Sequence, residues 1–264
     1  MHILATQTGV IGDSVEPVDL DQAPGDIVVI SAADSELAAL ARAQDSLESA
    51  PSLRLANVMA LTHNYSVDLY IEKTLRDARL IVLRLLGGAS YWPYGLEAIH
   101  AAAVEHGIRL AVLPGDDKPD PGLARFCTLD APSCDALWRF LIEGGSENAR
   151  GFLDACGDVL AGREIEGEAA PLLKAGVFGV PPSAPDGASP PQGGRVDAGT
   201  VAIVFYRALM QSGQTAPIEA LAKALAERGL AVLPVYVSSL KDPVSAATVE
   251  ALFDMHRPDV VLNA

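Results

Sequence analysis

The chain has 264 residues and a mass of 27.6 kDa, and 50% of its residues are hydrophobic, which is enough for a sizeable buried core. With 19 basic and 34 acidic residues, its formal net charge is −15. A surface of this charge repels phosphate backbones and anionic lipids, and no local basic patch offsets it. We therefore expect neither a nucleic-acid partner nor a membrane partner.

The apolar runs and the cysteines indicate the cellular compartment in which the protein works. The longest apolar runs, such as residues 80–86, have the length of strands and are much shorter than a bilayer span. Residues 1–7 lack the basic start and long apolar stretch of a signal peptide. Cys127, Cys134 and Cys156 are odd in number and have no metal-ligand spacing. We expect a cytoplasmic protein with reduced thiols and no metal ligands in this chain.

The first half of the chain alternates short apolar runs with longer amphipathic stretches. The short runs are typical of buried strands and cover residues 27–30, 53–56, 80–83 and 110–113, with residues 1–7 as a further candidate. Helical patterns lie between them at residues 35–47, 66–78 and 94–106. Because such alternation implies a parallel sheet covered on both faces, we predict a doubly wound, mostly parallel α/β domain over residues 1–132.

The middle of the chain loses this alternation. An acidic helical stretch over residues 133–161 predicts a helical extension, which we place at residues 133–175. Residues 176–199 hold 5 prolines and 6 glycines in 24 positions, which favours a linker or a draped loop.

The alternation resumes after the linker. Strands are predicted at residues 201–206, 230–237 and 259–263, with helices at 216–228 and 243–256. This order predicts a partial second Rossmann-like β-α-β-α-β unit over residues 200–264. A unit of about 65 residues with two open sheet edges is small for a compact domain. Either its strands join the first sheet or the chain is part of a longer protein, and we favour the second interpretation.

Nucleotide-binding signatures are absent from the sequence. It contains neither Gly-x-x-x-x-Gly-Lys-Ser/Thr nor Gly-x-Gly-x-x-Gly. Residues 9–12 carry two glycines after the first candidate strand, but prolines and acidic residues follow them instead of a helix start. We therefore do not expect a nicotinamide dehydrogenase or a nucleotide site in this chain.

The loop after the third predicted strand is the most unusual stretch. It reads Arg84-Leu-Leu-Gly-Gly-Ala-Ser-Tyr-Trp-Pro-Tyr-Gly-Leu-Glu97 and lies at the carboxyl edge of the sheet, where open α/β folds place ligands. Gly87 and Gly88 permit a sharp turn or a close approach to a ligand. Aromatic residues make up only 5% of the chain, yet three of them gather here: Tyr91, Trp92 and Tyr94. The loop either contacts a ligand directly or is a stiff structural loop.

Two polar clusters follow strands of the second unit. In residues 205–215, Arg207 and Gln211 are candidates to hold a carboxylate or an amide, although an exposed arginine beside a helix cap explains the pattern equally well. In residues 238–243, Ser239 and Lys241 are candidates for anion binding, and the alternative is a loop that caps the next helix.

Catalytic and metal-binding candidates are few. His100 and His106 are six residues apart and do not converge on one helix face, and His63 and His256 have no ligand-type neighbours. The acidic residues of 116–120 are candidates for Mg²⁺, but a solvated acidic turn explains them better. No nucleophile elbow occurs, so no catalytic residue is predicted.

Three long stretches resemble one known family. Residues 84–97, residues 205–219 (FYRALMQSGQTAPIE) and residues 229–243 (GLAVLPVYVSSLKDP) closely resemble the CobN-type large subunit of aerobic cobaltochelatases, which is related to the magnesium chelatase H subunit. Residues 63–68 and 114–117 also fit. The resemblance runs through nearly the whole chain in the same order.

This resemblance implies an activity for the parent protein. Proteins of this family bind a corrin precursor, hydrogenobyrinic acid a,c-diamide, and insert Co²⁺ during aerobic cobalamin biosynthesis. Two partner subunits, one of AAA+ type and one of integrin-I type, hydrolyse ATP to drive the insertion. The chain then resembles an amino-terminal piece that carries no cofactor of its own, because cobalt and ATP are used by the full complex. We expect the isolated piece to be catalytically inactive.

The resemblance also gives the polar and aromatic clusters a role. We predict that this piece forms part of the wall or lid of a tetrapyrrole cavity. The predicted substrate-binding residues are Arg84, Gly87, Gly88, Tyr91, Trp92, Tyr94, Arg207, Gln211, Ser239 and Lys241. The competing hypothesis is a non-catalytic docking module that holds partner subunits, and a small-molecule binding domain of periplasmic-receptor type is a weaker third.

Overall fold

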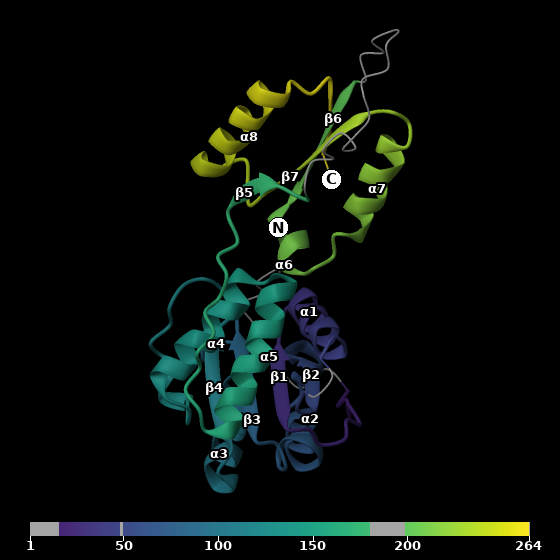
Figure 1. Ribbon diagram of the computed structural model, residues 1–264. Coiled ribbons are helices and arrows are strands. Elements are labelled where there is room, and N and C mark those ends of the chain that lie inside the picture. The colour runs from purple at the N-terminus through teal and green to yellow at the C-terminus, as the bar shows by residue number, and fades with distance from the viewer. Residues whose placement is uncertain (1–15, 48–49, 180–198, 264) are drawn as a thin grey trace, which may run out of the picture. The chain divides into compact units, whose positions relative to one another are not determined.

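The computed structural model describes residues 16–47, 50–179 and 199–263 and divides into two compact units, residues 1–170 and 171–264 (Figure 1). Each unit contains its own sheet, so the strands of the second unit do not join the first sheet. The candidate strand at 1–7, the glycines at 9–12 and most of the predicted linker lie outside the described residues.

The sheet of the first unit, sheet A, is parallel throughout. Its strand order is β2-β1-β3-β4, and the strands are β1 (Ile27–Ser31), β2 (Leu53–Asn57), β3 (Leu80–Leu85) and β4 (Arg109–Pro114). Every residue of β1 and β3 is buried, as expected for strands with helices on both faces. The four apolar runs in the sequence therefore predicted these strands correctly.

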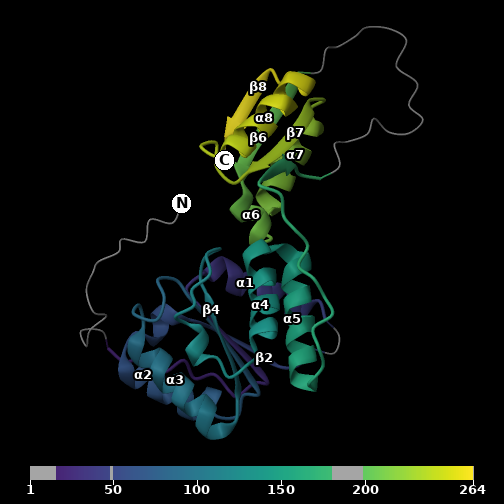
Figure 2. The same ribbon diagram turned by 90° about the vertical axis from the view of Figure 1, so that its left-hand side faces the viewer.

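Helices cover both faces of sheet A (Figure 2). Val28 and Ile30 point into one core cluster, and Ile27 and Val29 point into the other, because alternate strand residues face opposite sides. The second cluster is covered by α1 (Asp34–Asp45), α4 (Ala131–Glu143) and α5 (Gly145–Ala161). The first is covered by α2 (Asn64–Tyr70), its π-helical continuation Ile71–Leu75, and α3 (Pro93–His106), with the 3₁₀ turns Val58–Leu61 and Ala124–Phe126. The doubly wound α/β fold is confirmed.

The helical stretch predicted at 133–161 is two helices that pack on sheet A. The chain breaks between α4 and α5 at Gly144 and Gly145, whose φ angles of 65° and 85° favour residues without a Cβ. Phe140 of α4 and Phe152 of α5 lie in the core cluster beside the strands. These helices therefore belong to the same compact unit as the sheet.

The sheet of the second unit, sheet B, has the order β5-β7-β6-β8. Its parallel strands are β6 (Thr200–Tyr206), β7 (Ala231–Val237) and β8 (Val260–Asn263), and β5 (Ala175–Val177) adds an antiparallel edge. One face packs against α8 (Pro243–His256), and the other against α6 (Arg207–Gln211) and α7 (Ala216–Ala226). The predictions did not include β5 and α6. Within the described part of the chain, no helix has the length and apolar character needed to cross a membrane.

Candidate functional site

β1 and β3 are neighbours at the middle of sheet A. From β1 the chain adds β2 on one side of the sheet, and from β3 it adds β4 on the other. β1 leads into α1 on one face, and β3 leads into α3 on the other. Such a switch point is where open α/β sheets bind ligands, because diverging loops leave a crevice between them. The loop of residues 86–92, hereafter the β3 loop, begins at this point.

A buried ion pair lies at this switch point. Arg84 of β3 is opposite Ser31 of β1, and its guanidinium pairs with Glu36 from the first turn of α1. The two side chains are only 8% and 14% exposed. Arg84 Nη2 also donates to the Gly115 carbonyl at 3.4 Å. The guanidinium predicted to meet a substrate is therefore already engaged within the fold.

Glu36 is the less well satisfied member of this pair. Burial raises the pKa of its carboxyl above the ordinary value, while the positive charge of Arg84 and the side chain of Ser31 oppose the rise. Its Oε1 atom is buried without a hydrogen-bond partner. The geometry of this buried pair therefore depends on the packing around it.

The two glycines of the β3 loop make a sharp turn. Gly87 and Gly88 have φ angles of +92° and +75°, which side-chain-bearing residues rarely adopt. A Cβ at Gly88 would lie 2.7 Å from Oδ2 of Asp120. The Tyr91 ring lies 3.5 Å from where a Cβ at Gly87 would be. Backbone conformation and close packing therefore account for both glycines within the protein itself.

The aromatic residues of this region have different environments. Trp92 is 3% exposed, and its indole N–H donates to the Leu61 carbonyl at 3.0 Å. Gly95 makes room for it, since a Cβ there would lie 2.0 Å from the indole ring. Tyr91 is half-buried, and its hydroxyl lies 3.7 Å from Met59 Sδ. These contacts make Trp92 part of the core.

Tyr94 is the most accessible of the three aromatic residues. It is 40% exposed, and its hydroxyl donates to Oδ1 of Asp68 on α2 at 2.7 Å. This hydrogen bond raises the pKa of the Tyr94 phenol, because the neighbouring carboxylate disfavours a second negative charge. Tyr94 can therefore present a fixed, uncharged ring face to a ligand at this edge.

Sequence reasoning missed a polar pair at the neighbouring strand end. Asn57, the last residue of β2, donates to Asp34 Oδ1 at 2.5 Å. Asp34 does not cap α1, whose N-cap is Ala33 without a side-chain hydrogen bond. A signal for this pair is present in the sequence, because Asn57 and Asp34 both follow predicted strands and parallel strands end at one edge.

The predicted residues of the second unit lie at the carboxyl edge of sheet B. Arg207 donates from Nε to the Leu173 carbonyl at 3.0 Å and from Nη2 to the Leu172 carbonyl at 2.7 Å. Gln211 is the last residue of α6. Arg207 thus fastens the segment before β5, and a substrate role for either residue stays a prediction.

The loop after β7 is organised around a helix cap. Asp242 accepts from the Ser245 N–H at 2.9 Å and pairs with Lys174 at 3.1 Å, and these contacts lower the pKa of the Asp242 carboxyl. Ser239 Oγ accepts from the Lys241 N–H at 3.1 Å. Capping therefore explains most of the polar residues in this loop, and ligand binding by Ser239 and Lys241 remains a prediction.

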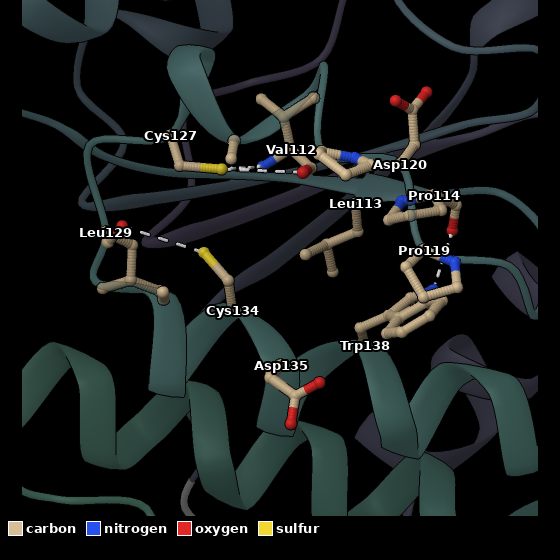
Figure 3. A pocket seen from close by; sticks show the side chains of 13 residues that line it. Val112, Leu113, Pro114, Pro119, Asp120, Cys127, Leu129, Cys134, Asp135 and Trp138 are labelled. Carbon is tan, nitrogen blue, oxygen red and sulfur yellow. Dashed lines mark hydrogen bonds between the residues drawn. The ribbon is translucent and has the colours of Figure 1, made fainter.

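A separate pocket of about 370 Å³ lies beside β4 in the first unit (Figure 3). Its walls come from β4, the loop that follows it, the 3₁₀ turn and α4. Cys127 and Cys134 lie together at one end, and Trp138 lies at the other. Among the described residues, no group of three His, Cys, Asp or Glu side chains is arranged to hold a metal ion.

Comparison with known proteins supports the resemblance found in the sequence. A family model described as CobN/Magnesium Chelatase matches residues 138–264. The aerobic cobaltochelatase subunit CobN of Sinorhizobium sp is 51% identical over the whole chain, and that of Pseudomonas aeruginosa is 37% identical. The chain is therefore similar to CobN along its whole length, and its second half matches the CobN/magnesium chelatase family model. The resemblance carried by residues 84–97, 205–219 and 229–243 is therefore confirmed.

The CobN relatives are much longer than this chain, which spans about a fifth of their length (21%). Among solved structures, the catalytic subunit of cobaltochelatase from Mycobacterium tuberculosis matches with a TM-score of 0.66. The match covers 90% of this chain and 18% of that one, at 22% identity. At this identity, the likeness shows a shared fold.

Proposed function

We propose that the protein containing this chain is the large subunit of an ATP-dependent cobaltochelatase, which inserts Co²⁺ into hydrogenobyrinic acid a,c-diamide in aerobic cobalamin biosynthesis. The observation that carries the proposal is 51% identity to a CobN subunit along the entire chain. The chain's own sequence has no phosphate-binding motif. Following the family resemblance, the proposal assigns ATP hydrolysis to partner subunits of AAA+ and integrin-I type.

Within that subunit, we assign the β3 loop and the start of α3 to the wall or lid of the tetrapyrrole cavity. Tyr94 is exposed at the carboxyl edge, and its ring offers a flat apolar face to a corrin. Trp92 and the Arg84–Glu36 pair act as positioning groups, because they fix the two ends of the loop from the core side. Precursor binding then depends on Tyr94 directly and on Trp92 through loop geometry.

The test measures precursor affinity in the full-length protein. Tyr94→Ala is expected to raise the dissociation constant of hydrogenobyrinic acid a,c-diamide by about 2- to 10-fold, the usual value of an aromatic contact. Tyr94→Phe keeps the ring and should bind within about 2-fold of the unaltered protein. Val104→Ala, at the opposite end of α3, is a matched control, since Val104 is also exposed and apolar. Unchanged affinity in Tyr94→Ala contradicts the cavity role.

A second candidate function is a docking module for the partner subunits. It is favoured by exposed apolar side chains on α8 of the second unit, where Val244 is 60% and Met255 74% exposed. Met255→Glu in the full-length protein should then weaken co-purification of the ATPase subunits and leave precursor affinity unchanged. Val104→Glu, in the first unit, serves as the control. Normal complex formation in Met255→Glu rules out docking through this surface.

A further inference from the structure

The pocket beside β4 contains two free thiols that the proposed cobaltochelatase function does not use. Cys127 and Cys134 are both half-buried and line the pocket, whereas Cys156 is fully buried in the core. Cys127 follows the 3₁₀ turn and Cys134 lies in the first turn of α4 (Figure 3). The pair is therefore accessible from an open cavity, and the third cysteine is not.

The surroundings of Cys127 favour its ionised form. The Val112 N–H donates to Cys127 Sγ at 3.3 Å, and Cys134 lies beside Cys127 at the same end of the pocket. When Cys127 is protonated, the Val112 carbonyl at 3.5 Å accepts its S–H. These contacts lower the pKa of Cys127 to about 7, with the interaction with Cys134 as the largest cause. The lowered pKa makes Cys127 more reactive near neutral pH than an ordinary cysteine thiol.

Cys134 has the opposite character. Its interaction with Cys127 raises the pKa of the Cys134 thiol, and burial and the charge of Asp130 add to the rise. Its S–H also faces the Leu129 carbonyl at 3.8 Å. The Val112 N–H thus makes Cys127 the more easily ionised of the two thiols.

Charged groups around the pair are mainly acidic. Asp120 and Asp135 line the pocket, and Asp130 caps α4 beside it. Basic groups lie on two of the elements around the pocket: on α4, Arg139 Nε pairs with Oδ2 of Asp135 at 2.8 Å, and in the 3₁₀ turn Arg125 lies over the Phe126 ring at 4.7 Å. Among the described residues that line the pocket, none is basic. The pocket therefore favours a neutral or positively charged reagent.

We propose that Cys127 and Cys134 form a thiol modification site, in which Cys127 reacts with a small organic disulfide in the pocket and Cys134 resolves the product. In the first step, Cys127 Sγ⁻ attacks one sulfur of the reagent, the reagent's S–S bond breaks, and one thiolate leaves and is protonated. In the second, Cys134 loses its proton and attacks Cys127 Sγ, which releases the second thiol. The two cysteines are oxidised to one disulfide, and the reagent is reduced to two thiols.

The experiment exposes the full-length protein to cystamine, which carries two ammonium groups, and to the anionic oxidised glutathione, and maps the products by peptide mass. We expect a Cys127–Cys134 disulfide, formed more than about ten-fold faster with cystamine at low salt, with the difference shrinking as salt is added. Cys134→Ser should keep a cysteamine adduct on Cys127. Cys127→Ser should leave Cys134 unmodified, and Cys156→Ser should behave as the unaltered protein.

A second readout needs no variant. The alkylation rate of Cys127 in the unaltered protein should reach half of its maximum near pH 7, whereas Cys156 should stay unreactive. The proposal is overturned if Cys127 follows the profile of an ordinary thiol, half-maximal at about pH 8.5. It is also overturned if cystamine leaves no Cys127–Cys134 disulfide, or if Cys134→Ser shows no adduct.

Discussion

Sheet A and sheet B have the same parallel core, but the two units bury their sheets to different depths. Among the described residues, the clusters on the two faces of sheet A contain 21 and 19 buried residues, and those of sheet B contain seven and five. All of β1 is buried, whereas Val260 and Val261 of β8 are about half exposed, at 49% and 48%. An apolar strand is therefore buried only where helices cover it.

The polar contacts of the two units differ in the same way. Arg84 and Glu36 pair inside the first unit, where water does not screen them. Lys174 and Asp242 pair at the surface of the second, with exposures of 61% and 23%. Loss of one partner should therefore be costly in the first unit and mild in the second.

The largest effect is expected from equivalent core truncations. Phe152→Ala and Phe205→Ala each remove a fully buried ring, at a cost of about 3–5 kcal/mol. The first unit has a core large enough to stay folded after this loss, whereas the second should unfold. Hydrogen exchange of β7 in the 264-residue chain measures this directly, because the cores compared are those of this chain. Protection of β7 that survives Phe205→Ala would show that the second unit is more stable than its core indicates.

Breaking the buried ion pair is the next largest change. Arg84→Met leaves a buried carboxylate without its partner and should cost about 3–5 kcal/mol. Adding Glu36→Gln should recover much of this loss, because the second change removes the unpaired charge. Both tryptophans lie in the first unit, so fluorescence-monitored urea unfolding reports on that unit. Lys174→Met is the counterpart in the second unit and is followed there by hydrogen exchange of β7. A loss of stability as large as that in Arg84→Met contradicts the difference between the two units.

The pH dependence of stability tests the protonation of Glu36 in the Arg84–Glu36 pair. Burial raises the pKa of Glu36 above the ordinary 4.5, so the folded state holds this proton more tightly than the unfolded state. The resulting stability is complete below the unfolded pKa and is lost as pH rises through the folded pKa. Glu36→Gln removes this titration, so the stability of the variant relative to the unaltered protein should rise with pH above the ordinary pKa of a glutamate. If the difference in stability between Glu36→Gln and the unaltered protein does not change with pH, the pKa of Glu36 is not raised in the folded state.

The smallest effect concerns the β3 loop. Trp92→Phe removes the donor to the buried Leu61 carbonyl and should cost about 1–3 kcal/mol. Tyr94→Phe, at the exposed end of the same region, should change stability by no more than about 0.5 kcal/mol. Urea unfolding of the two variants separates the roles. If the two variants lose the same amount of stability, the hydrogen bond from Trp92 to Leu61 does not anchor the β3 loop to the core.

The strands and long helices were predictable because their apolar periodicity is strong over many residues. Two elements were too short to give such a pattern: β5 has three residues and α6 has five. The break between α4 and α5 has a visible signal, the Gly144-Gly145 pair. Short elements gain their stability from tertiary contacts, so local sequence does not reveal them.

The site was predictable in position but not in its contacts. The switch-point location of the β3 loop follows from strand order alone. The pairing of Arg84 with Glu36 joins residues 48 positions apart, which no local pattern predicts. The inward position of Trp92 has a signal at Gly95, three residues later, where the missing side chain makes room for the indole ring.

The central claim, that this chain is part of a cobaltochelatase, is tested most directly by metal insertion. The full-length protein is combined with its ATPase partner subunits, hydrogenobyrinic acid a,c-diamide, Co²⁺ and ATP, and the corrin absorbance is followed. We predict a shift to the cobalt-corrin spectrum that needs all five components. No cobalt incorporation by the complete mixture, or insertion of Mg²⁺ into a porphyrin by the same subunits, would contradict the account.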